Sequence, residues 1–197
     1  MQPGDTFVYD FIAPDAGTYW YHPHLGTPEQ VGRGLYGALI VQEQDPLVVD
    51  RDIVWLIDDW RLDGQARIIE DFYSWSDVAF DGRVGNTVTV NGMEHYRESV
   101  ACGERIRIRL INTAKARMVS LSFGPHPAWI MALDGQPLPK ASPMGPDDNV
   151  FLGPGQRADV IVDLTVGEGG TVPVMDRLNL RRPYALAAFD YAASGRS

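Results

Sequence analysis

Two histidines separated by one residue, His22 and His24, have the spacing that could bind metal ions. They end the stretch Gly-Thr-Tyr-Trp-Tyr-His-Pro-His, whose alternation is typical of a strand. Residues two apart on a strand share one face, with Cα atoms about 6.6–6.8 Å apart, so the two imidazoles can lie side by side. Imidazole suits copper, zinc, iron and nickel, and two histidines neither choose among these ions nor complete a site. An incidental pair would have the same spacing, so both interpretations stay open on spacing alone.

The other candidate side chains do not extend this pair within the sequence. Cys102 lies in Val-Ala-Cys-Gly-Glu without a flanking histidine, which predicts a buried or turn thiol and not a copper ligand. His95 and His126 lie in loop contexts, and we expect structural or solvent-exposed roles for both. A carboxylate such as Glu29 or Asp15 could join the histidines in a zinc site that activates water, although no spacing specifically supports that ligand set.

Alternation with period two predicts the strands that must position the histidines. Aromatic and other side chains alternate over residues 5–11, and further strands are predicted over 18–24 and 35–42. Asp-Pro at 45–46 then breaks the pattern. A sheet of three short strands leaves an apolar face and unpaired edges, so we expect it to dock on the rest of the chain or on another chain.

A longer run of strands follows the Asp-Pro break. These strands are predicted over 52–58, 105–110, 118–123, 128–133, 157–164 and 184–191. Arg105, Arg107 and Arg109 alternate with apolar residues, which predicts a sheet whose arginine face lies in water. The loop-like residues 61–85 carry aromatic side chains that we expect to cover an edge of the core. These side chains are Phe72, Tyr73, Trp75 and Phe80.

Composition excludes several classes of partner. The 197 residues exceed one ordinary β-sandwich domain of roughly 100 residues. A net charge of −9 repels phosphate backbones and anionic lipids, so we expect neither nucleic-acid nor membrane binding. The chain as written has no basic segment followed by an apolar signal core, and no apolar run of the ~18 residues that a membrane span needs. Its single cysteine does not identify a compartment.

The wider context of the histidine pair resembles a known family. Residues 17–24, followed by Gln30 and by Gly-Leu-Tyr-Gly-Ala-Leu-Ile-Val at 34–41, closely resemble the second copper-binding segment of the laccase-like multicopper oxidases. Later segments look like successive landmarks of that family's middle cupredoxin domain, and together they span most of the chain. They are Asp58-Asp-Trp60, Val90-Asn-Gly92, Arg107-Ile-Arg-Leu-Ile-Asn112, Ala132-Leu-Asp-Gly135 and Pro154-Gly-Gln-Arg-Ala-Asp-Val160.

The resemblance implies an all-β chain with a cupredoxin-like Greek-key β-sandwich, one complete domain preceded by a partial one. Residues 1–44 would be the C-terminal strands of the first cupredoxin domain, residues 45–192 the second domain, and residues 193–197 a tail. Relatives are often periplasmic or secreted, but this chain alone does not determine its compartment.

The resemblance also implies chemistry. Such oxidases take electrons from a small reducing substrate at a mononuclear copper and reduce dioxygen at a three-copper cluster. His22 and His24 would each ligate one copper of the type 3 pair, with Pro23 where the family often has serine. The family's first His-x-His and its His-Cys-His do not occur in these residues, so the type 3 copper sites are incomplete. We therefore expect a segment that supplies ligands and scaffold to a copper oxidase and is inactive as a laccase alone.

Two other functions remain open. A non-catalytic copper-binding or interaction module could form a homo-oligomer through the strands of residues 5–42 and gather His22 and His24 from several copies. A metal-dependent hydrolase is the weaker alternative. Dioxygen and a reducing substrate would be partners only if the copper site is completed.

Overall fold

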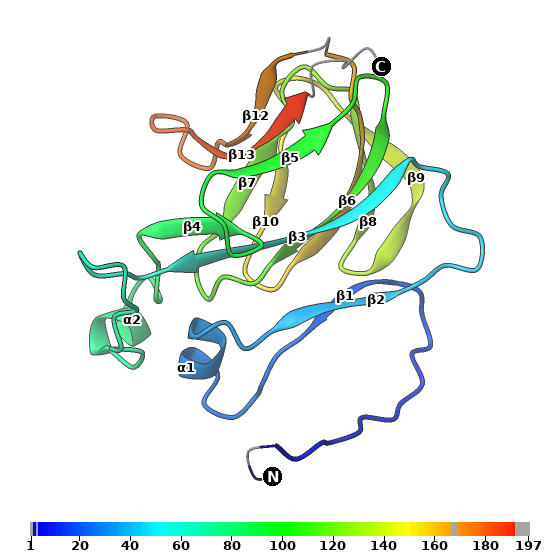
Figure 1. The fold of residues 1–197 in the computed structure, drawn as a ribbon. Helices are drawn as coiled ribbons and strands as arrows, with labels where there is room; N and C mark the ends of the chain where they lie inside the picture. Colours follow the sequence, from blue (N-terminus) through cyan, green and yellow to red (C-terminus); the bar gives the residue numbers. More distant parts are fainter. Residues whose placement is uncertain (1, 3, 167–168, 192–197) are drawn as a thin grey trace.

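The regular structure of the chain is almost entirely β (Figure 1). The computed structural model describes residues 2, 4–166 and 169–191. Its strands are β1 (Gly17–Tyr21), β2 (Gly37–Val41), β3 (Arg51–Trp60), β4 (Thr87–Val90), β5 (Tyr96–Val100), β6 (Arg105–Asn112), β7 (Val119–Ser122), β8 (Ala128–Leu133), β9 (Gln136–Met144), β10 (Val150–Leu152), β11 (Arg157–Asp163), β12 (Thr171–Asp176) and β13 (Tyr184–Tyr191). The all-β prediction is confirmed, and the predicted tail at 193–197 lies outside the described residues.

Most of the described strands form a sandwich of two sheets. The larger sheet has the order β4-β3-β6-β11-β8-β9, and the smaller has the order β10-β7-β12-β13-β5. Neighbouring strands are antiparallel except for the parallel pairs β3 with β6 and β13 with β5. This non-sequential order requires connections that cross between the sheets, as in a Greek-key sandwich.

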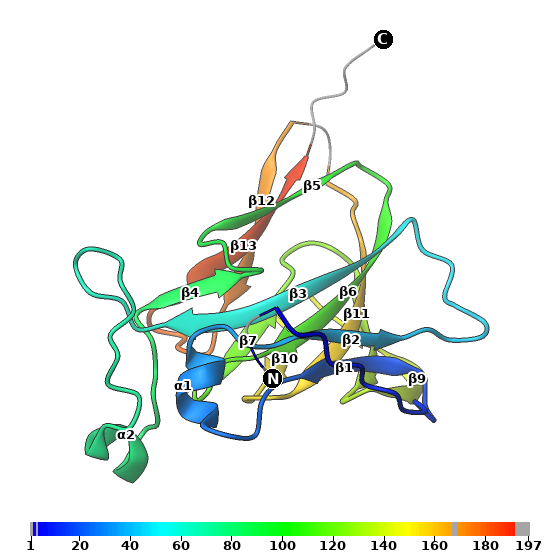
Figure 2. The ribbon, with the colours of Figure 1, turned by 60° about the horizontal axis from the view of Figure 1, so that its bottom comes forward.

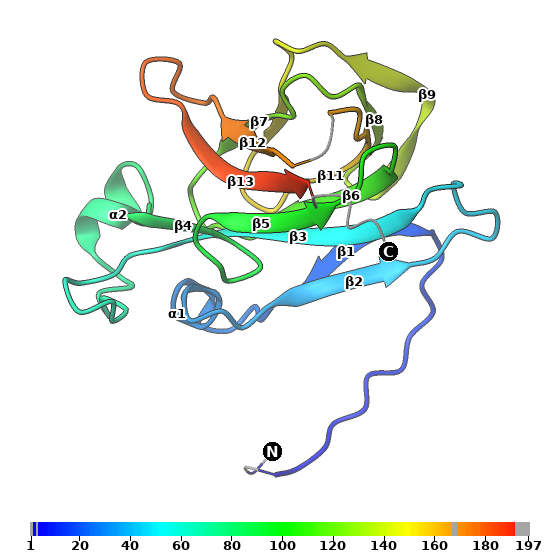
Figure 3. The same cartoon turned by 45° about the horizontal axis from the view of Figure 1, so that its top comes forward.

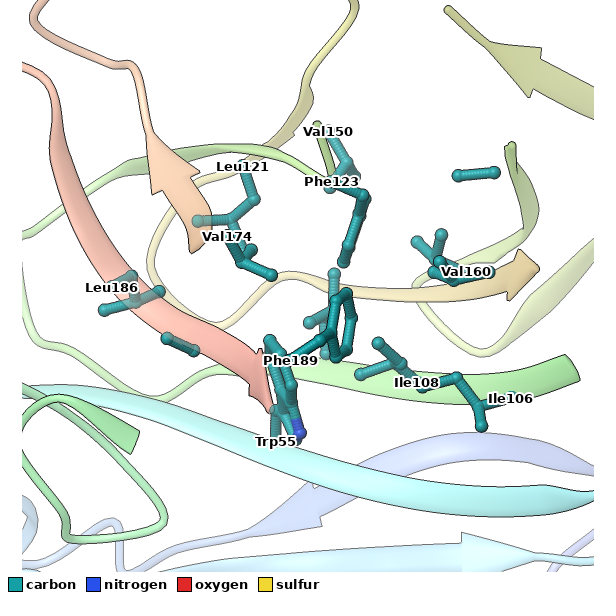
Figure 4. Close-up of a cluster of buried hydrophobic side chains, with 14 of the residues drawn as sticks. Trp55, Ile106, Ile108, Leu121, Phe123, Val150, Val160, Val174, Leu186 and Phe189 are labelled. Atoms are coloured by element: carbon teal, nitrogen blue, oxygen red, sulfur yellow. The ribbon is translucent and has the colours of Figure 1, made fainter. Parts of the chain in front are cut away.

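The hydrophobic core lies between these two sheets. Trp55 of β3 packs against Phe189 of β13 with ring centroids 5.9 Å apart, and neither side chain is exposed (Figure 4). Ile106 and Ile108 project into the same core from β6, and Leu121 and Val174 do so from the opposite sheet. The alternation predicted for 105–110 therefore places its apolar side chains as expected.

A separate two-stranded sheet, β1 with β2, lies against the larger sheet of the sandwich (Figure 1). The two strands are antiparallel, with Gly17 opposite Val41. β1 contacts β6 and β11, and β2 contacts β3. The expectation that this part of the chain docks on the rest is confirmed.

The predicted strand over residues 5–11 is wrong. These residues carry no regular structure and run away from the β1–β2 sheet as an extended segment (Figure 3). The side chains of Tyr9 and Ile12 are 81% and 91% exposed. An alternating sequence forms a strand only where a neighbour pairs with its backbone, and no described strand lies beside this segment.

The predicted aqueous arginine face is also wrong for two of its three members. Arg107 and Arg109 are each 3% exposed because the β1–β2 sheet covers this face of β6. Arg105 is the first residue of β6, where its side chain is half exposed and pairs with Asp163 at 2.6 Å. Alternation predicted which residues share a face, but not that a second layer would cover it.

Two short helices complete the described structure. They are α1 (Thr27–Gly32), between β1 and β2, and α2 (Trp75–Ala79), within the loop-like residues 61–85, and both lie at the same end of the molecule (Figures 1 and 2). Neither is long and apolar enough to cross a bilayer.

The aromatic side chains of residues 61–85 do not act together. Phe72 is buried, and the guanidinium groups of Arg33 and Arg83 lie over its ring, 5.0 and 4.5 Å from the centroid. The other three, Tyr73, Trp75 and Phe80, are exposed. The expectation of an aromatic cover over the core edge is therefore wrong for these three, and Phe72 instead joins this loop to α1.

Candidate metal centre

His22 and His24 lie just after β1, in the turn that leads into α1. β1 ends at Tyr21, earlier than predicted, because Pro23 has no backbone N–H to continue a strand ladder. The two imidazoles nevertheless lie side by side, with centroids 4.8 Å apart and ring planes 14° from parallel. His22 also stacks on Trp20 of β1 at 4.2 Å, so three rings form one continuous stack.

A near-parallel stack limits how these rings can bind metal. The lone pair of an imidazole nitrogen lies in its ring plane, and metal–nitrogen bonds are about 2.0–2.1 Å long. The two ring planes are stacked and nearly parallel, so in this arrangement their lone pairs do not converge on one ion at that distance. The geometry favours one metal ion for each ring.

The hydrogen bonding of His22 suits a metal ligand. Its Nδ1 lies 3.2 Å from the carbonyl oxygen of Pro23, which can only accept, so Nδ1–H is the donor. Nε2 of the neutral ring then keeps its lone pair for a metal. Histidines that bind metals commonly donate their other N–H to a carbonyl in this way.

The described residues do not complete the ligand set. They contain no group of three or more His, Cys, Asp or Glu side chains that could hold a metal ion. Glu29 is engaged with Arg33 at 2.9 Å, and Asp15 is exposed. The pair therefore fits copper by the chemistry of its donors, but it supplies only part of a coordination shell. The zinc site with Glu29 or Asp15 is not assembled in this structure.

His22 lines two cavities. One has a volume of about 420 Å³ and is lined by Trp20 and His22 together with Phe72, Lys115 and Gly155. The other, of about 560 Å³, is lined mainly by apolar side chains. Its lining residues are Tyr9, Phe11, Tyr21, His22, Pro23, Leu35 and Leu39. His22 is thus the residue that these two cavities share.

A buried acidic group lies close to the ring stack. Tyr36, whose ring is 6.3 Å from that of Trp20, donates its hydroxyl to Asp58 Oδ2 at 2.6 Å. Burial raises the pKa of Asp58 to about 6, partly opposed by the Tyr36 hydrogen bond and by the positive charge of Lys115. Burial also lowers the pKa of Lys115. Two adjacent aspartates at the end of an apolar strand are the one local sign of this group in the sequence.

The remaining candidate residues lie away from the pair. His126 is 3% exposed, packs edge-on against Phe189, and has its pKa lowered by burial. Its Nε2 lies 3.4 Å from the hydroxyl of Tyr191. His95 is exposed beside Glu94, and Cys102 is an exposed thiol in a turn. These placements agree with structural or solvent-exposed roles.

Comparison with known families decides where the chain belongs. Models described as multicopper oxidase match residues 1–46 and residues 51–170, so the second match alone covers more than half of the chain. The chain belongs to the multicopper oxidase family. Its fold is accordingly cupredoxin-like, as the sequence predicted, and copper is the metal that the family implies for this site.

Individual multicopper oxidases and their relatives give the same result. The chain is 29% identical over 184 residues to Laccase-3 of Botryotinia fuckeliana, covering 85% of this chain and 38% of the laccase. It is 32% identical over 180 residues to the cell division protein FtsP of Edwardsiella tarda, covering 85% of this chain and 37% of FtsP. The crystal structure of a multi-copper oxidase from Pseudomonas thermotolerans superposes with a TM-score of 0.81 at 30% identity, covering 93% of this chain and 42% of that one. The chain thus spans about two fifths of the length of these proteins.

Proposed function

We propose that this chain supplies two ligands and their scaffold to a copper oxidase, with His22 and His24 each binding one copper of a type 3 pair. The reaction would couple oxidation of a small reducing substrate to reduction of dioxygen. The proposal depends on one observation above all, the stacked imidazole pair in which each ring suits its own ion. The family match over the same residues supports copper as that ion.

We also propose how the chain is divided. Residues 1–44 would be the last strands of a first cupredoxin domain and residues 45–192 a complete second domain. The separate β1–β2 sheet and the self-contained core of the sandwich support this division. In this arrangement the second domain contributes no copper ligand and acts as a support for the first.

Within the proposed site, the residues of this chain bind and orient. Nε2 of His22 would be a copper ligand while its Nδ1–H is held by the carbonyl of Pro23. The His22 ring is stacked on the indole of Trp20 and against the ring of His24. Bound copper would supply the one-electron steps between the reducing substrate and dioxygen. Two imidazoles are too few for that chemistry, so residues 1–197 alone should show negligible oxygen uptake with a phenol or with Cu(I).

Copper analysis of purified variants tests the proposal. Wild type should bind Cu(II) with nitrogen ligands detectable by electron paramagnetic resonance. His22→Ala and His24→Ala should each lose at least about tenfold in affinity, because each removes a proposed ligand. His95→Ala is the matched control, since this histidine is exposed and remote from the pair, and it should bind like wild type. Unchanged copper binding in His22→Ala would refute the proposed ligand role.

Oxygen uptake and visible absorption test the expected inactivity of the chain. Rapid oxygen uptake by the wild-type chain, or an intense Cu–thiolate absorption band, would refute its inactivity.

A non-catalytic module that oligomerises through residues 5–42 is the second candidate. The exposed apolar side chains of the extended segment favour it, because Phe7, Val8, Tyr9, Phe11 and Ile12 are all at least 58% exposed. The similarity to FtsP, whose name denotes a cell division protein, also favours a role outside oxidation. Native mass and copper stoichiometry decide this candidate. A defined oligomer with copper shared between copies would support it, and a monomer without copper would refute it.

A further inference from the structure

We infer that Thr18 is a positioning residue for the histidine pair, because its buried hydrogen bonds to Asp159 and Arg109 fix the strand that carries the Trp20–His22–His24 ring stack. The inference rests on the proposed role of His22 and His24. It adds that the sandwich, which supplies no ligand, sets the orientation of the ligands.

The hydroxyl of Thr18 lies at the centre of a buried ionic network. It is completely buried, donates to Asp159 Oδ1 at 2.6 Å and accepts from Arg109 Nη1 at 2.8 Å. Asp159 is 1% exposed, and its other oxygen accepts from Arg107 Nη2 at 2.5 Å. Arg107 and Arg109 bind Glu43 and Asp52 as well. Water cannot replace a hydrogen bond lost here without opening the interface, so the network holds Thr18 firmly.

Backbone contacts around Thr18 fix the same strand. A Cβ atom at Gly17 would collide with the carbonyl oxygen of Gly135, so these two backbone segments are in close contact. Arg157 Nε also donates to the carbonyl of Thr18 at 3.3 Å. A one-residue slip of β1 would break these contacts and move Thr18 to the opposite face. The register of β1 on the sandwich is therefore defined.

The ring stack begins two residues after Thr18, at Trp20 of β1, and continues with His22 and His24 in the turn that follows. Residues two apart share a face, so Trp20 follows Thr18 on the side that meets the sandwich. The indole lies against the loop at Gly155, where an added Cβ would be 3.7 Å from it, and stacks on His22 at 4.2 Å. Within the described part of the chain, His24 makes no side-chain hydrogen bond and has the His22 ring as its aromatic neighbour. The orientation of both imidazoles thus depends on how β1 is held.

A pair of matched threonine substitutions tests the inference in the full chain. Thr18→Val removes the hydroxyl and keeps the shape of the side chain. Thr171→Val is the control, because Thr171 also donates to an aspartate, Asp190 at 2.8 Å, but at an exposed site on β12. The readouts are the imidazole proton shifts of the metal-free protein by nuclear magnetic resonance and the Cu(II) affinity by titration.

Thr18→Val should shift the His22 and His24 ring protons, as their stacking is lost, and weaken copper binding about tenfold, the lower end of what outer contacts contribute to metal affinity. Thr18→Ser keeps the hydroxyl and should restore both readouts, and Thr171→Val should change neither. Unchanged ring shifts and copper affinity in folded Thr18→Val would overturn the inference. If wild type binds no copper but Thr18→Val still changes the imidazole proton shifts of His22 and His24, the ligand role fails and the positioning role stands.

A second substitution keeps the inference testable if Thr18→Val does not fold. Trp20→Phe leaves the hydrogen bonds of Thr18 untouched and replaces the indole that stacks on His22 by a smaller ring. It should change the His22 ring shifts and lower the copper affinity. Wild-type values for both readouts in Trp20→Phe would equally overturn the inference.

Discussion

The sandwich and the β1–β2 sheet are both made of alternating strands, yet they use their faces in opposite ways. In the sandwich, apolar faces meet each other around Trp55 and Phe189. The β1–β2 sheet instead meets the sandwich through buried polar groups, among them Thr18 and Arg107. Apolar side chains such as Tyr21 of β1 and Leu35, just before β2, are left exposed. The apolar core and the candidate ligands therefore belong to different parts of the molecule, which ionic contacts join.

Removal of the central core tryptophan should have the largest effect. Trp55→Ala leaves a cavity between the two sheets and should lower the free energy of unfolding by about 3–5 kcal/mol, measured by urea denaturation with circular dichroism. Trp75→Ala provides the contrast, since Trp75 is 74% exposed and its loss should cost no more than about 0.5 kcal/mol. Similar costs for the two variants would contradict the view that the sandwich core dominates stability.

The arginines of β6 test the junction. Arg107→Ala leaves Asp159 buried without its 2.5 Å partner and should cost about 3 kcal/mol in urea denaturation. Arg105→Ala removes a half-exposed pair with Asp163 and should cost no more than about 1 kcal/mol. Equal losses of unfolding free energy in the two variants would instead agree with the single solvated arginine face that alternation predicted.

The buried carboxyl of Asp58 makes the junction sensitive to pH. Because burial raises its pKa from 3.8 to about 6, the folded chain holds this proton more tightly than the unfolded chain does. Its contribution to stability is therefore fully present below pH 3.8 and is lost as pH rises through about 6. Asp58→Asn removes this dependence. As pH rises over that interval, the free energy of unfolding of the variant should therefore increase relative to wild type by up to roughly 3 kcal/mol.

Urea denaturation at a series of pH values measures this effect. Asp147→Asn is a control at a fully exposed carboxylate and should follow the wild-type curve. A constant difference between Asp58→Asn and wild type at all pH values would show that Asp58 titrates normally.

The extended segment should have the smallest effect on the monomer. Phe11 is 64% exposed, so Phe11→Ser should change unfolding free energy by less than about 0.5 kcal/mol in dilute protein. If a second copy covers this segment, wild type will gain stability as its concentration rises and Phe11→Ser will not. A large loss in dilute monomer would show that the segment packs on its own chain.

Predictions from the sequence were best where one strand face buries apolar side chains. The segments 105–110, 128–133 and 184–191 alternate clearly, and each forms a strand of the sandwich. The sequence does not predict β4, β5, β9, β10 or β12. β4, β5 and β10 have five residues or fewer, and β9 and β12 contain prolines. The spacing of the histidine pair makes it a candidate, and the family resemblance gives it a copper role. Asp58, Tyr36 and Lys115 come from distant parts of the chain, and no local pattern links them.

The all-β class, the family and the two candidate ligands could be predicted from the sequence, because alternation and short motifs are properties of neighbouring residues. The folded chain was needed to show that Arg107 and Arg109 are buried, that no described strand pairs with residues 5–11, and that the two imidazoles are stacked nearly parallel. Each of these depends on what packs against a face from elsewhere in the chain. Periodicity shows which side chains share a face, but burial, pairing and ring orientation are set by the layer that covers it.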